Sequence, residues 1–404
     1  MRWQGRPLSR TRMGAPPQVV WQTSATLDAG GSLLIGVPTE IKTEEYRVAI
    51  TPVGVRELTA RGHRALVQRG AGEASSISDD DYVAAGAEIV AAADDVFAEA
   101  EIILKVKEPQ IAEIAKLTAG QTLFTYLHLA AYPRQAEGLM GSGATAIAYE
   151  TVELPSGALP LLAPMSEIAG RLAAQAGAHY LEKPRGGRGV LVGGVPGVAP
   201  ARVTVVGAGS AGTNAAMIAA GMGADVVILD INVERLRHLD ELHWGRFTTI
   251  RSSIHAIDEL APVSDLVVGA VLVAGARAPT VVTAEHIKSM RPGSVVVDIS
   301  IDQGGCIETA HETSHADPVY TVDDVVHYAV GNIPGAVPNT STYALTNATL
   351  PYVVALAGGL GAAVTRFPEL LKGINVAGGR MTHPAVAESI GQEYQAPETV
   401  LSLN

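Results

Sequence analysis

The sequence has little of several features that large classes of protein require. Its 404 residues include one cysteine, Cys306, which excludes an internal disulfide and any zinc site built from several cysteines. Aromatic residues make up only 4%, and no block of lysine or arginine interrupts a chain of formal net charge −12. A chain without a basic block lacks the electrostatic basis for binding nucleic acid. We therefore expect an intracellular, cytoplasmic protein that binds no nucleic acid.

Long charge-free segments are also rare, and the one that stands out spans residues 338–365. It is largely apolar and long enough to cross a bilayer. However, it contains Asn339, Asn347, Pro351 and several threonines, so we interpret it as a buried helix and expect no membrane span.

The first 32 residues have no hydrophobic period, and they carry four arginines and no acidic residue before Asp28. A transit peptide can have this composition, but ordered patterning begins abruptly at residue 33. We interpret residues 1–32 as a disordered or extraneous N-terminal extension.

A β-branched run, a glycine-rich turn, a helical stretch and an acid follow one another over residues 202–230. Gly207, Gly209 and Gly212 give the spacing G-x-G-x-x-G, in which the first glycine permits a tight turn. The second lets the backbone approach a pyrophosphate, and the third lets the helix pack on the strand. Asp230 stands where a carboxylate accepts hydrogen bonds from an adenosine ribose and repels a 2′-phosphate. The pattern predicts a βαβ unit that binds NAD in preference to NADP.

Short apolar runs alternate with helical stretches along most of the chain, and this predicts an α/β fold with two Rossmann-like, doubly wound domains. We place a catalytic, substrate-binding domain at residues 33–160 and an NAD-binding domain at 161–336. A C-terminal segment, 337–404, shows no further strand alternation and is expected to return to the first domain. The active site is expected in the cleft between the two domains.

Polar residues at the ends of predicted strands are candidates for chemistry, because doubly wound sheets bind ligands at the carboxyl ends of their strands. Lys105 and Lys107 end one run, His128 ends a second and Asp302 ends a third, while Arg47 precedes the first predicted helix. Arginine can hold a carboxylate through two parallel bonds, and lysine can assist it or polarise an imine. Histidine transfers protons near neutral pH, and an acid can orient it.

Each of these residues also has a structural interpretation. Arg47 can be a surface ion-pair partner of Glu44 or Glu45. His128 can be a satisfied core residue, the lysines can be exposed strand ends, and the acid before Gln-Gly-Gly can be an ordinary turn residue. The chemical interpretation depends on whether the fold brings the residues together.

Metal chemistry has one apparent signal, the H-E-x-x-H spacing at residues 311–315. A zinc site of this type needs a well-formed helix and a third ligand, whereas this polar stretch is cut short by Asp317-Pro318. Cys306 has no adjacent base and is interpreted as structural. We predict no metal site.

Several motifs, taken in order, resemble those of the family that contains alanine dehydrogenase and the alpha subunit of NAD(P) transhydrogenase. They are GVPTEIKTEEYRVAITP (36–52), LKVKEP (104–109), LFTYLHLA (123–130), LLAPMSEIAGRLAAQAGA (161–178), VTVVGAGSAG (203–212), LVVGAVLVAGARAP (266–279), VVVDISIDQGGC (295–306) and VPNTSTYALTNATLPYV (337–353). The resemblance covers the chain from about residue 33 to its C-terminus.

The resemblance to the alanine dehydrogenases implies reversible oxidative deamination of L-alanine by NAD to pyruvate and ammonium, through an imine, in a homohexamer. Arg47 is then expected to bind the substrate carboxylate with the help of Lys107, His128 to act as the acid and base, and Asp302 to complete the site. The residues expected to contact NAD are Ser166, Gly207, Gly209, Ser210, Ala211, Gly212, Asp230, Arg235, Ser252, Val271, Leu272, Ile299, Ser300, Ile301, Asp302, Val330, Gly331, Asn332 and Ile333.

The sequence departs from the family pattern at a few positions. Asn339 replaces an expected basic residue, and Ala274 stands where proline is common. Some members hold a divalent ion between an acid, to which Glu150 corresponds, and a histidine, whose place Gly359 takes here. The resemblance therefore also implies no metal in this chain.

Two alternatives to the dehydrogenase remain open. One is the NAD-binding component of a proton-translocating transhydrogenase, which has no amino-acid substrate. Members of that type tend to lack the histidine and the acid that correspond to His128 and Asp302, so these two residues favour the dehydrogenase. The other is a redox-sensing module that holds NAD without turnover, against which the full set of polar residues argues.

Overall fold

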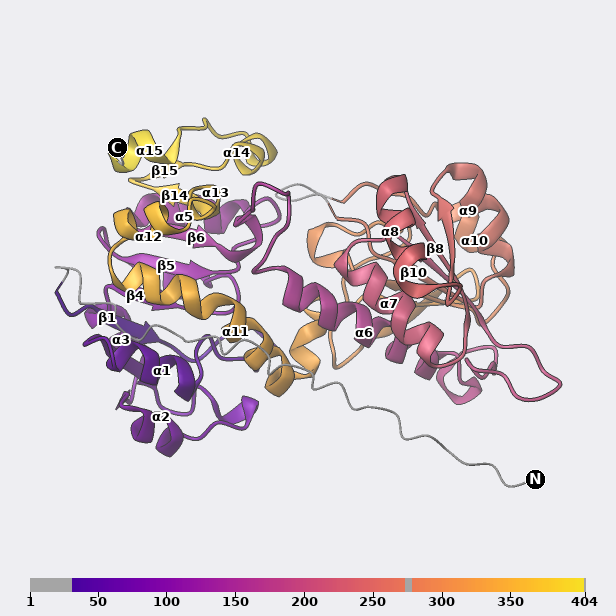
Figure 1. Ribbon diagram of the computed structural model, residues 1–404, viewed down its shortest axis with the longest axis horizontal. Coiled ribbons are helices and arrows are strands. Elements are labelled where there is room, and N and C mark those ends of the chain that lie inside the picture. Colours follow the sequence, from indigo (N-terminus) through magenta and orange to yellow (C-terminus); the bar gives the residue numbers. More distant parts are fainter. Residues whose placement is uncertain (1–30, 273–277, 403–404) are drawn as a thin grey trace, which may run out of the picture. The chain divides into compact units, whose positions relative to one another are not determined.

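The computed structural model describes residues 31–272 and 278–402 (Figure 1). The extension predicted at residues 1–32 lies outside these ranges except for its last two residues, and Ala274 lies outside them too. All elements below belong to the described ranges.

The first sheet contains eight strands in the order β15-β14-β6-β5-β4-β1-β2-β3. Its six parallel strands are β1 (Leu34–Val37), β2 (Arg64–Gln68), β3 (Glu88–Val90), β4 (Ile102–Leu104), β5 (Thr122–Thr125) and β6 (Thr145–Ala148). The helices between them are α1 (Pro52–Thr59), α2 (Asp79–Ala85), α3 (Ala93–Glu99), α4 (Ile111–Ile114) and α5 (Pro133–Ser142). The strand order from β3 to β6 is the 3-2-1-4-5-6 order of a doubly wound fold.

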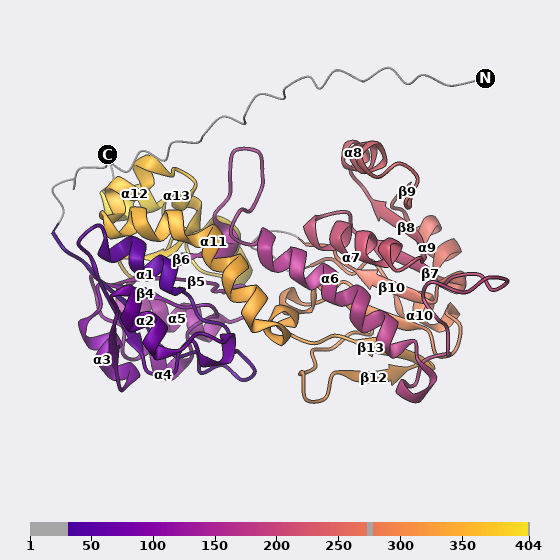
Figure 2. The same ribbon diagram turned by 60° about the horizontal axis from the view of Figure 1, so that its bottom comes forward.

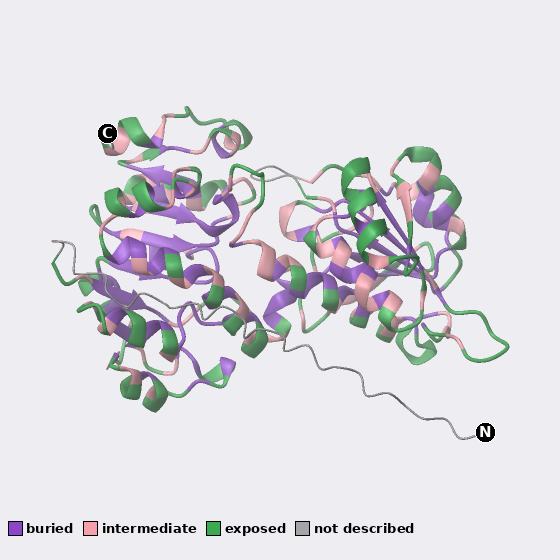
Figure 3. Ribbon diagram, in the orientation of Figure 1, coloured by how far each residue is buried: buried purple, intermediate pink, exposed green. Residues whose placement is uncertain are grey.

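The strands of this sheet are apolar because both of its faces are covered. Ile102 and Leu104 of β4 pack into one hydrophobic cluster, whereas Ile103 packs into another on the opposite face. Strands buried on both faces have continuous rather than alternating apolar runs. Figure 3 shows the buried strands and the exposed outer surfaces of the helices.

The C-terminal segment completes the first sheet. β14 (Ile374–Ala377) pairs antiparallel with β6, and β15 (Arg380–Met381) pairs antiparallel with β14. Segments far apart in the sequence therefore lie side by side in this sheet (Figure 1). The expectation that this segment has no strand alternation was wrong. β14 has four consecutive buried residues, and a run so short and so uniform carries no period-2 signal.

The rest of this segment is helical. Its helices are α11 (Pro338–Ala357), α12 (Leu360–Arg366), α13 (Leu370–Gly373), α14 (Pro384–Ile390) and α15 (Pro397–Leu401). α11 contacts α1 and α6 (Ala163–Tyr180) and buries Leu345, Val353 and Leu356 in the core (Figure 2). No helix in the described residues is both long enough and apolar enough to cross a membrane.

The second sheet contains seven strands in the order β12-β13-β11-β10-β7-β8-β9. They are β7 (Arg202–Val206), β8 (Asp225–Asp230), β9 (Thr248–Arg251), β10 (Leu266–Gly269), β11 (Val295–Asp298), β12 (Val319–Val322) and β13 (Val325–Tyr328), and only β12 is antiparallel. The helices between them are α7 (Ser210–Gly221), α8 (Val233–His243), α9 (Ile254–Leu260) and α10 (Ala284–Ser289). The order from β9 to β13 repeats the order of the first sheet, which confirms the predicted fold class. The residue boundaries of the two domains stay a prediction.

Close packing between α6 and α7 fixes the start of α7 at the edge of the second sheet. A β-carbon built at Gly170 of α6 would clash with the backbone oxygen of Ala211 in α7. Because Gly170 has no side chain, the two helices can approach this closely. The first turn of α7 carries the predicted phosphate-binding N–H groups, so this contact positions the candidate site.

Substitution of Gly170 tests this contact. Gly170→Ala should lower the free energy of unfolding by about 1–3 kcal/mol, because the added methyl group must force α6 and α7 apart. The matched control is Gly221→Ala at the end of α7, where a β-carbon would meet no atom within 4 Å. That change should be neutral or stabilising by about 0.5–1 kcal/mol, owing to the helix propensity of alanine. Equal effects of the two substitutions in urea unfolding would contradict the role given to Gly170.

Candidate active site

A cavity of about 760 Å³, called the cleft below, is lined by residues that precede or follow strands of both sheets. It brings together all four residues that the sequence singled out for substrate and catalysis, namely Arg47, Lys107, His128 and Asp302. Lys105 is not among its lining residues. Its ammonium group instead forms buried ion pairs with Glu40 and Glu113, each at 2.8 Å, so it has a structural role.

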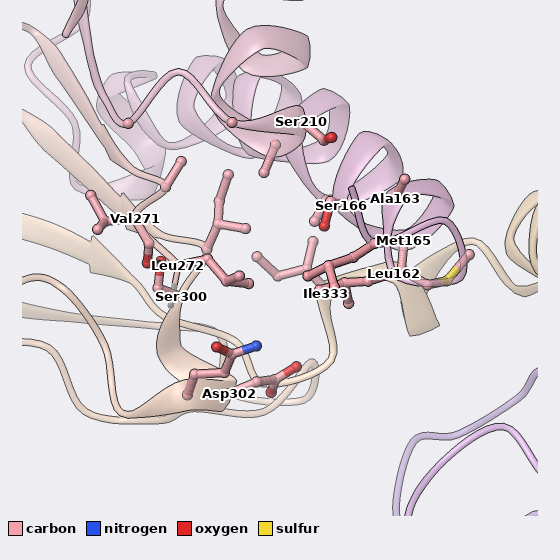
Figure 4. Close-up of a pocket in the computed structure, with 18 of the residues that line it drawn as sticks. Leu162, Ala163, Met165, Ser166, Ser210, Val271, Leu272, Ser300, Asp302 and Ile333 are labelled. Carbon is pink, nitrogen blue, oxygen red and sulfur yellow. Dashed lines mark hydrogen bonds between the residues drawn. The ribbon is translucent and has the colours of Figure 1, made fainter. Parts of the chain in front are cut away.

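Most of the residues expected to contact a dinucleotide also line the cleft. These are Ser166, Gly207, Gly209, Ser210, Ala211, Asp230, Arg235, Ser252, Val271, Leu272, Ile299, Ser300, Asp302, Val330, Asn332 and Ile333. Figure 4 shows Ser166 on α6 near Ser210 at the start of α7. Val271, Leu272 and Ser300 lie across the cleft from them, after β10 and β11.

Gly212, Ile301 and Gly331 do not line the cleft. A β-carbon at Gly212 would clash with the backbone oxygen of Gly207, so Gly212 allows α7 to pack against the preceding turn. Ile301 is buried, and a side chain at Gly331 would collide with Glu312. These three residues are therefore packed within the protein next to residues that line the cleft.

The glycine turn after β7 has a backbone that suits a bound pyrophosphate. Gly207 has φ +105°, a left-handed conformation that L side chains rarely adopt. A β-carbon at Gly209 would meet no atom within 4 Å, so this part of the backbone borders open space in the cleft. The first N–H groups of α7 follow at once and have no partners within the helix. Backbone and helix end thus fit an anionic diphosphate.

Asp230, at the end of β8, is held in a fixed orientation. Its two oxygens accept hydrogen bonds from the backbone N–H groups of Ala208, at 2.7 Å, and Asn232, at 2.8 Å. The nearby Arg235 donates from Nη1 to the carbonyl of Ala208 at 3.0 Å. The carboxylate retains lone pairs for further donors, such as the hydroxyl groups of a ribose.

Arg47 is buried in the wall of the cleft, with 2% of its surface exposed. Its Nε and Nη2 donate to the two oxygens of Glu45 at 2.7 and 2.5 Å, and Nη2 also donates to Oδ1 of Asn332 at 2.6 Å. Glu45 is therefore the ion-pair partner, but the predicted alternative of a surface pair was wrong. Glu44 instead accepts from the backbone of His315 and Ala316.

This arrangement limits how Arg47 can bind a carboxylate. Burial disfavours both charges of the pair, yet Glu45 raises the pKa of Arg47 and Arg47 lowers the pKa of Glu45, so both remain ionised. The Nε–Nη2 edge of the guanidinium is occupied by Glu45. Among the described residues, Nη1 has one hydrogen-bond partner, the sulfur of Met165, and Arg47 is one of the residues that line the cleft. Nη1 is therefore the nitrogen that remains for a substrate carboxylate, instead of the two parallel hydrogen bonds that the sequence predicted.

Lys107 and Asp302 form an ion pair in the lining of the cleft. The distance from Nζ to Oδ2 is 3.4 Å, and the other oxygen, Oδ1, accepts the backbone N–H of Asn332 at 3.0 Å. Burial alone would raise the pKa of Asp302, but the positive charges of Lys107 and Lys42 and the proximity of His128 lower it to about 2. Asp302 is therefore a carboxylate at neutral pH.

His128 has an unusual backbone for a residue that is not glycine, with φ +47°. The carboxylate of Glu150 accepts its backbone N–H at 2.6 Å and that of Leu127 at 3.2 Å, which stabilises this left-handed conformation. The imidazole lies nearly parallel to the ring of Tyr126, with 5.8 Å between centroids. Burial, followed by the positive charge of Lys107, lowers the pKa of His128, although nearby carboxylates oppose the shift. At neutral pH the imidazole is therefore uncharged and can accept a proton.

Several important residues of this site were not found from the sequence. Glu45 was considered only as a surface partner, Asn332 only as a dinucleotide contact, and Glu150 only in connection with a metal. Asn332 contacts Arg47 across 285 residues and Glu150 contacts His128 across 22 residues, so no local sequence signal encodes these two partners. Glu45 is a sequence neighbour of Arg47, but the burial of their ion pair depends on the fold.

The H-E-x-x-H segment has no helix to place its histidines on one face. His311 stacks on Tyr320, and Nε2 of His315 is 3.2 Å from the carbonyl oxygen of Asn332. The described residues include no group of three or more histidine, cysteine or acidic side chains arranged to hold a metal. Cys306 is fully buried, and burial raises the pKa of its thiol, as expected of a structural cysteine.

Of the two residues that differ from the family's motifs, Asn339 and Ala274, only Asn339 lies in the described part of the chain. Asn339 does not line the cleft and instead donates to the carbonyl of Ser75 at 2.8 Å. Ala274 lies outside the described residues.

The pKa of His128 can be measured and shifted. Histidine-selective NMR, assigned with the His128→Gln variant, should give a pKa below the ordinary value of about 6.5. Lys107→Met should raise that pKa, because it removes a positive charge while preserving an apolar stem. Lys116→Met, at an exposed lysine paired with Asp94, is the control and should leave the pKa unchanged. A His128 pKa that does not respond to Lys107→Met would refute the electrostatic coupling.

Comparisons with known proteins show which family this chain belongs to. Two family models match the chain, the N-terminal domain of alanine dehydrogenase/PNT over residues 36–169 and the C-terminal domain over residues 173–384. The chain is 57% identical over 361 residues to an alanine dehydrogenase of Halomonas elongata, covering 89% of this chain and 97% of that protein. It is 54% identical over 369 residues to that of Mycobacterium tuberculosis strain H37Rv, covering 91% and 100%.

Among solved structures, an alanine dehydrogenase is more similar to this chain than a transhydrogenase is. An L-alanine dehydrogenase superposes with a TM-score of 0.84 at 52% identity, covering 89% of this chain and 99% of the other. A transhydrogenase from Sinorhizobium meliloti superposes with a TM-score of 0.73 at 27% identity, covering 87% and 99%.

Proposed function

Since the chain belongs to the alanine dehydrogenase/PNT family, we propose that it catalyses the reversible, NAD-dependent oxidative deamination of L-alanine. The observation that carries the proposal is the presence of Arg47, Lys107, His128 and Asp302 in one cleft with the glycine turn after β7. In the overall reaction, L-alanine, NAD⁺ and water give pyruvate, ammonium, NADH and a proton. When bound, NAD⁺ supplies the hydride acceptor.

The positive groups of the cleft would orient the substrate. Nη1 of Arg47 and Nζ of Lys107 are the cations available to a carboxylate, and Glu45 and Asn332 hold the guanidinium in place. A substrate fixed in this way presents its α-carbon in one orientation, which removes much of the entropic cost of reaction. Burial of Arg47 strengthens the interaction by limiting competition from water.

His128 would move the protons. As a neutral imidazole it takes a proton from the water that adds to the imine carbon, and it returns a proton to the departing nitrogen. Asp302, held by Lys107 and the backbone of Asn332, would stabilise the imidazolium formed in between. Glu150 and Tyr126 keep the ring in position through the backbone and by stacking.

The end of β8 supports NAD over NADP. The fixed carboxylate of Asp230 would accept hydrogen bonds from ribose hydroxyls and would repel a 2′-phosphate. Arg235, a cation in the lining of the same cleft, already donates to the carbonyl of Ala208. Homohexamer formation and a cytoplasmic location, which the resemblance and the composition suggested, stay predictions.

The comparisons favour a dehydrogenase over the two alternatives. The similarity to a transhydrogenase is weaker in both identity and superposition. A sensor that only binds NAD would need neither the neutral His128 nor the ionised Asp302 beside it.

An absorbance assay tests the function. L-alanine and NAD⁺ should produce NADH, with a higher kcat/KM for NAD⁺ than for NADP⁺. His128→Ala should lower kcat by about 10²- to 10⁴-fold, the usual contribution of a positioned acid–base group, with little change in the Kd of NADH. His255→Ala, at an exposed histidine, is the matched control. Absence of NADH formation by the unmodified protein would refute the proposal, and an equal loss of binding in His128→Ala would make that histidine structural.

The role of Arg47 is tested by a change that keeps its charge. Arg47→Lys should raise the KM of alanine by about tenfold or more, because lysine cannot bond Glu45, Asn332 and a carboxylate at the same time. Arg56→Lys, at an exposed arginine of α1, should leave the KM unchanged. Urea unfolding should accompany the kinetics, because the variant also alters a buried ion pair. A folded Arg47→Lys protein with an unaltered alanine KM would remove Arg47 from the carboxylate site.

A further inference from the structure

A second cavity of about 370 Å³, called the side pocket below, adjoins the cleft. The two cavities share His128, Asp302 and Gln303, so these residues form the partition between them. The remaining lining of the side pocket comes from the residues after β5 and β6, from the start of α5, from Gly304 and from α14.

The side pocket has both exposed and buried residues in its lining. Ala131 and Ser389 are exposed, whereas Leu129, Glu150 and Val386 are buried. His128 lies in the lining of both cavities, so the side pocket gives this histidine a second set of neighbours besides those of the cleft.

The charged side chains of the two cavities differ. None of the described residues that line the side pocket is a lysine or an arginine, and two of them, Glu150 and Asp302, are acids. The cleft, in contrast, has the cations Arg47, Lys107 and Arg235 in its lining beside the acids Asp230 and Asp302. A small cation is favoured in the side pocket, and carboxylates and phosphates are favoured in the cleft.

The partition also contains an acceptor without a partner. The Oε1 atom of Gln303 is buried and has no hydrogen-bond partner among the described residues. An unpaired buried oxygen is costly unless a donor visits it. Ammonium is a cation with four N–H donors, and it matches both an amide oxygen and the carboxylates of Glu150 and Asp302 in the same lining.

We propose that the side pocket is the route by which ammonium leaves after deamination and enters for amination, separate from the cleft that takes alanine, pyruvate and the dinucleotide. The inference rests on the proposed function. In deamination the carbon–nitrogen bond of the hydrated imine breaks, its electron pair stays on nitrogen, and the protonated nitrogen leaves past Gln303. In amination the same path runs in reverse, and ammonium gives up a proton to His128 before its nitrogen attacks the carbonyl carbon of pyruvate.

A separate path would let ammonium leave or enter while the larger ligands stay bound in the cleft. A dinucleotide and pyruvate together occupy the cleft that leads to His128, and their anionic groups attract any ammonium that passes them. A second opening lets the small product depart while the larger ligands remain bound. It also keeps ammonium away from the positive groups that hold the carboxylate.

The test uses charge changes at Ser389, an exposed residue of the side-pocket lining, measured in the amination direction with pyruvate, NADH and ammonium chloride. At low and constant ionic strength, Ser389→Lys should lower kcat/KM for ammonium by about threefold and Ser389→Glu should raise it by a similar factor. Both effects should shrink in about 0.5 M sodium chloride, because salt screens exposed charges. The kcat/KM values for pyruvate and NADH should stay within experimental error of the unmodified protein.

Ser289 of α10 supplies the matched control, because it is also an exposed helical serine whose hydroxyl donates to a backbone carbonyl of its own helix. Ser289→Lys and Ser289→Glu should not change kcat/KM for ammonium. The inference is overturned if the Ser389 variants leave that value unchanged, or if pyruvate shows an opposite change of equal size, which would indicate a general field. If the unmodified protein shows no alanine-dependent activity, the proposed function fails and the inference fails with it.

Discussion

Asn332 is the residue on which the arrangement of the site depends, because it joins two ion pairs, Arg47 with Glu45 and Lys107 with Asp302. Its side chain accepts from Arg47 and donates to Glu45, while its backbone N–H donates to Asp302. Its own backbone is left-handed, with φ +61°, and this conformation directs the N–H and the side chain to different partners. Without Asn332, the guanidinium would lose its second anchor and the Asp302 carboxylate would lose a donor. Carboxylate binding and proton transfer are therefore coupled through one residue, by its side chain on one side and its backbone N–H on the other.

His128 shows how a strained residue can be held in place. Its left-handed backbone is unfavourable for a residue with a β-carbon, and the two hydrogen bonds from neighbouring N–H groups to Glu150 offset that cost. The same carboxylate lies near enough to oppose the lowering of the histidine pKa. Glu150 thus acts on both the conformation and the proton affinity of His128.

The fold and most of the residues that line the cleft could be predicted from the sequence, but the hydrogen bonds and ion pairs among these residues could not. The runs that form the parallel strands and the glycine spacing of residues 207–212 are local signals, so the doubly wound class followed from them. β14 was missed because four buried residues carry no period. The edge of Arg47 that faces the substrate could not be foreseen either, since it depends on Glu45 and Asn332 meeting in the folded chain. Local patterns encode elements, whereas the geometry of a site depends on long-range contacts.

The cleft has cations in its lining and the side pocket has none among its described lining residues, and this difference gives a reason for the acid at their boundary. Asp302 borders both the cleft and the side pocket, and its low pKa keeps it ionised over the whole range in which the protein is expected to work. On the side of the cleft it faces Lys107, which offsets its charge near a substrate carboxylate. On the side pocket it has no cationic neighbour among the described lining residues, so its charge there attracts a cation. One ionised side chain can therefore help to orient the histidine and, at the same time, separate an anionic product from a cationic one.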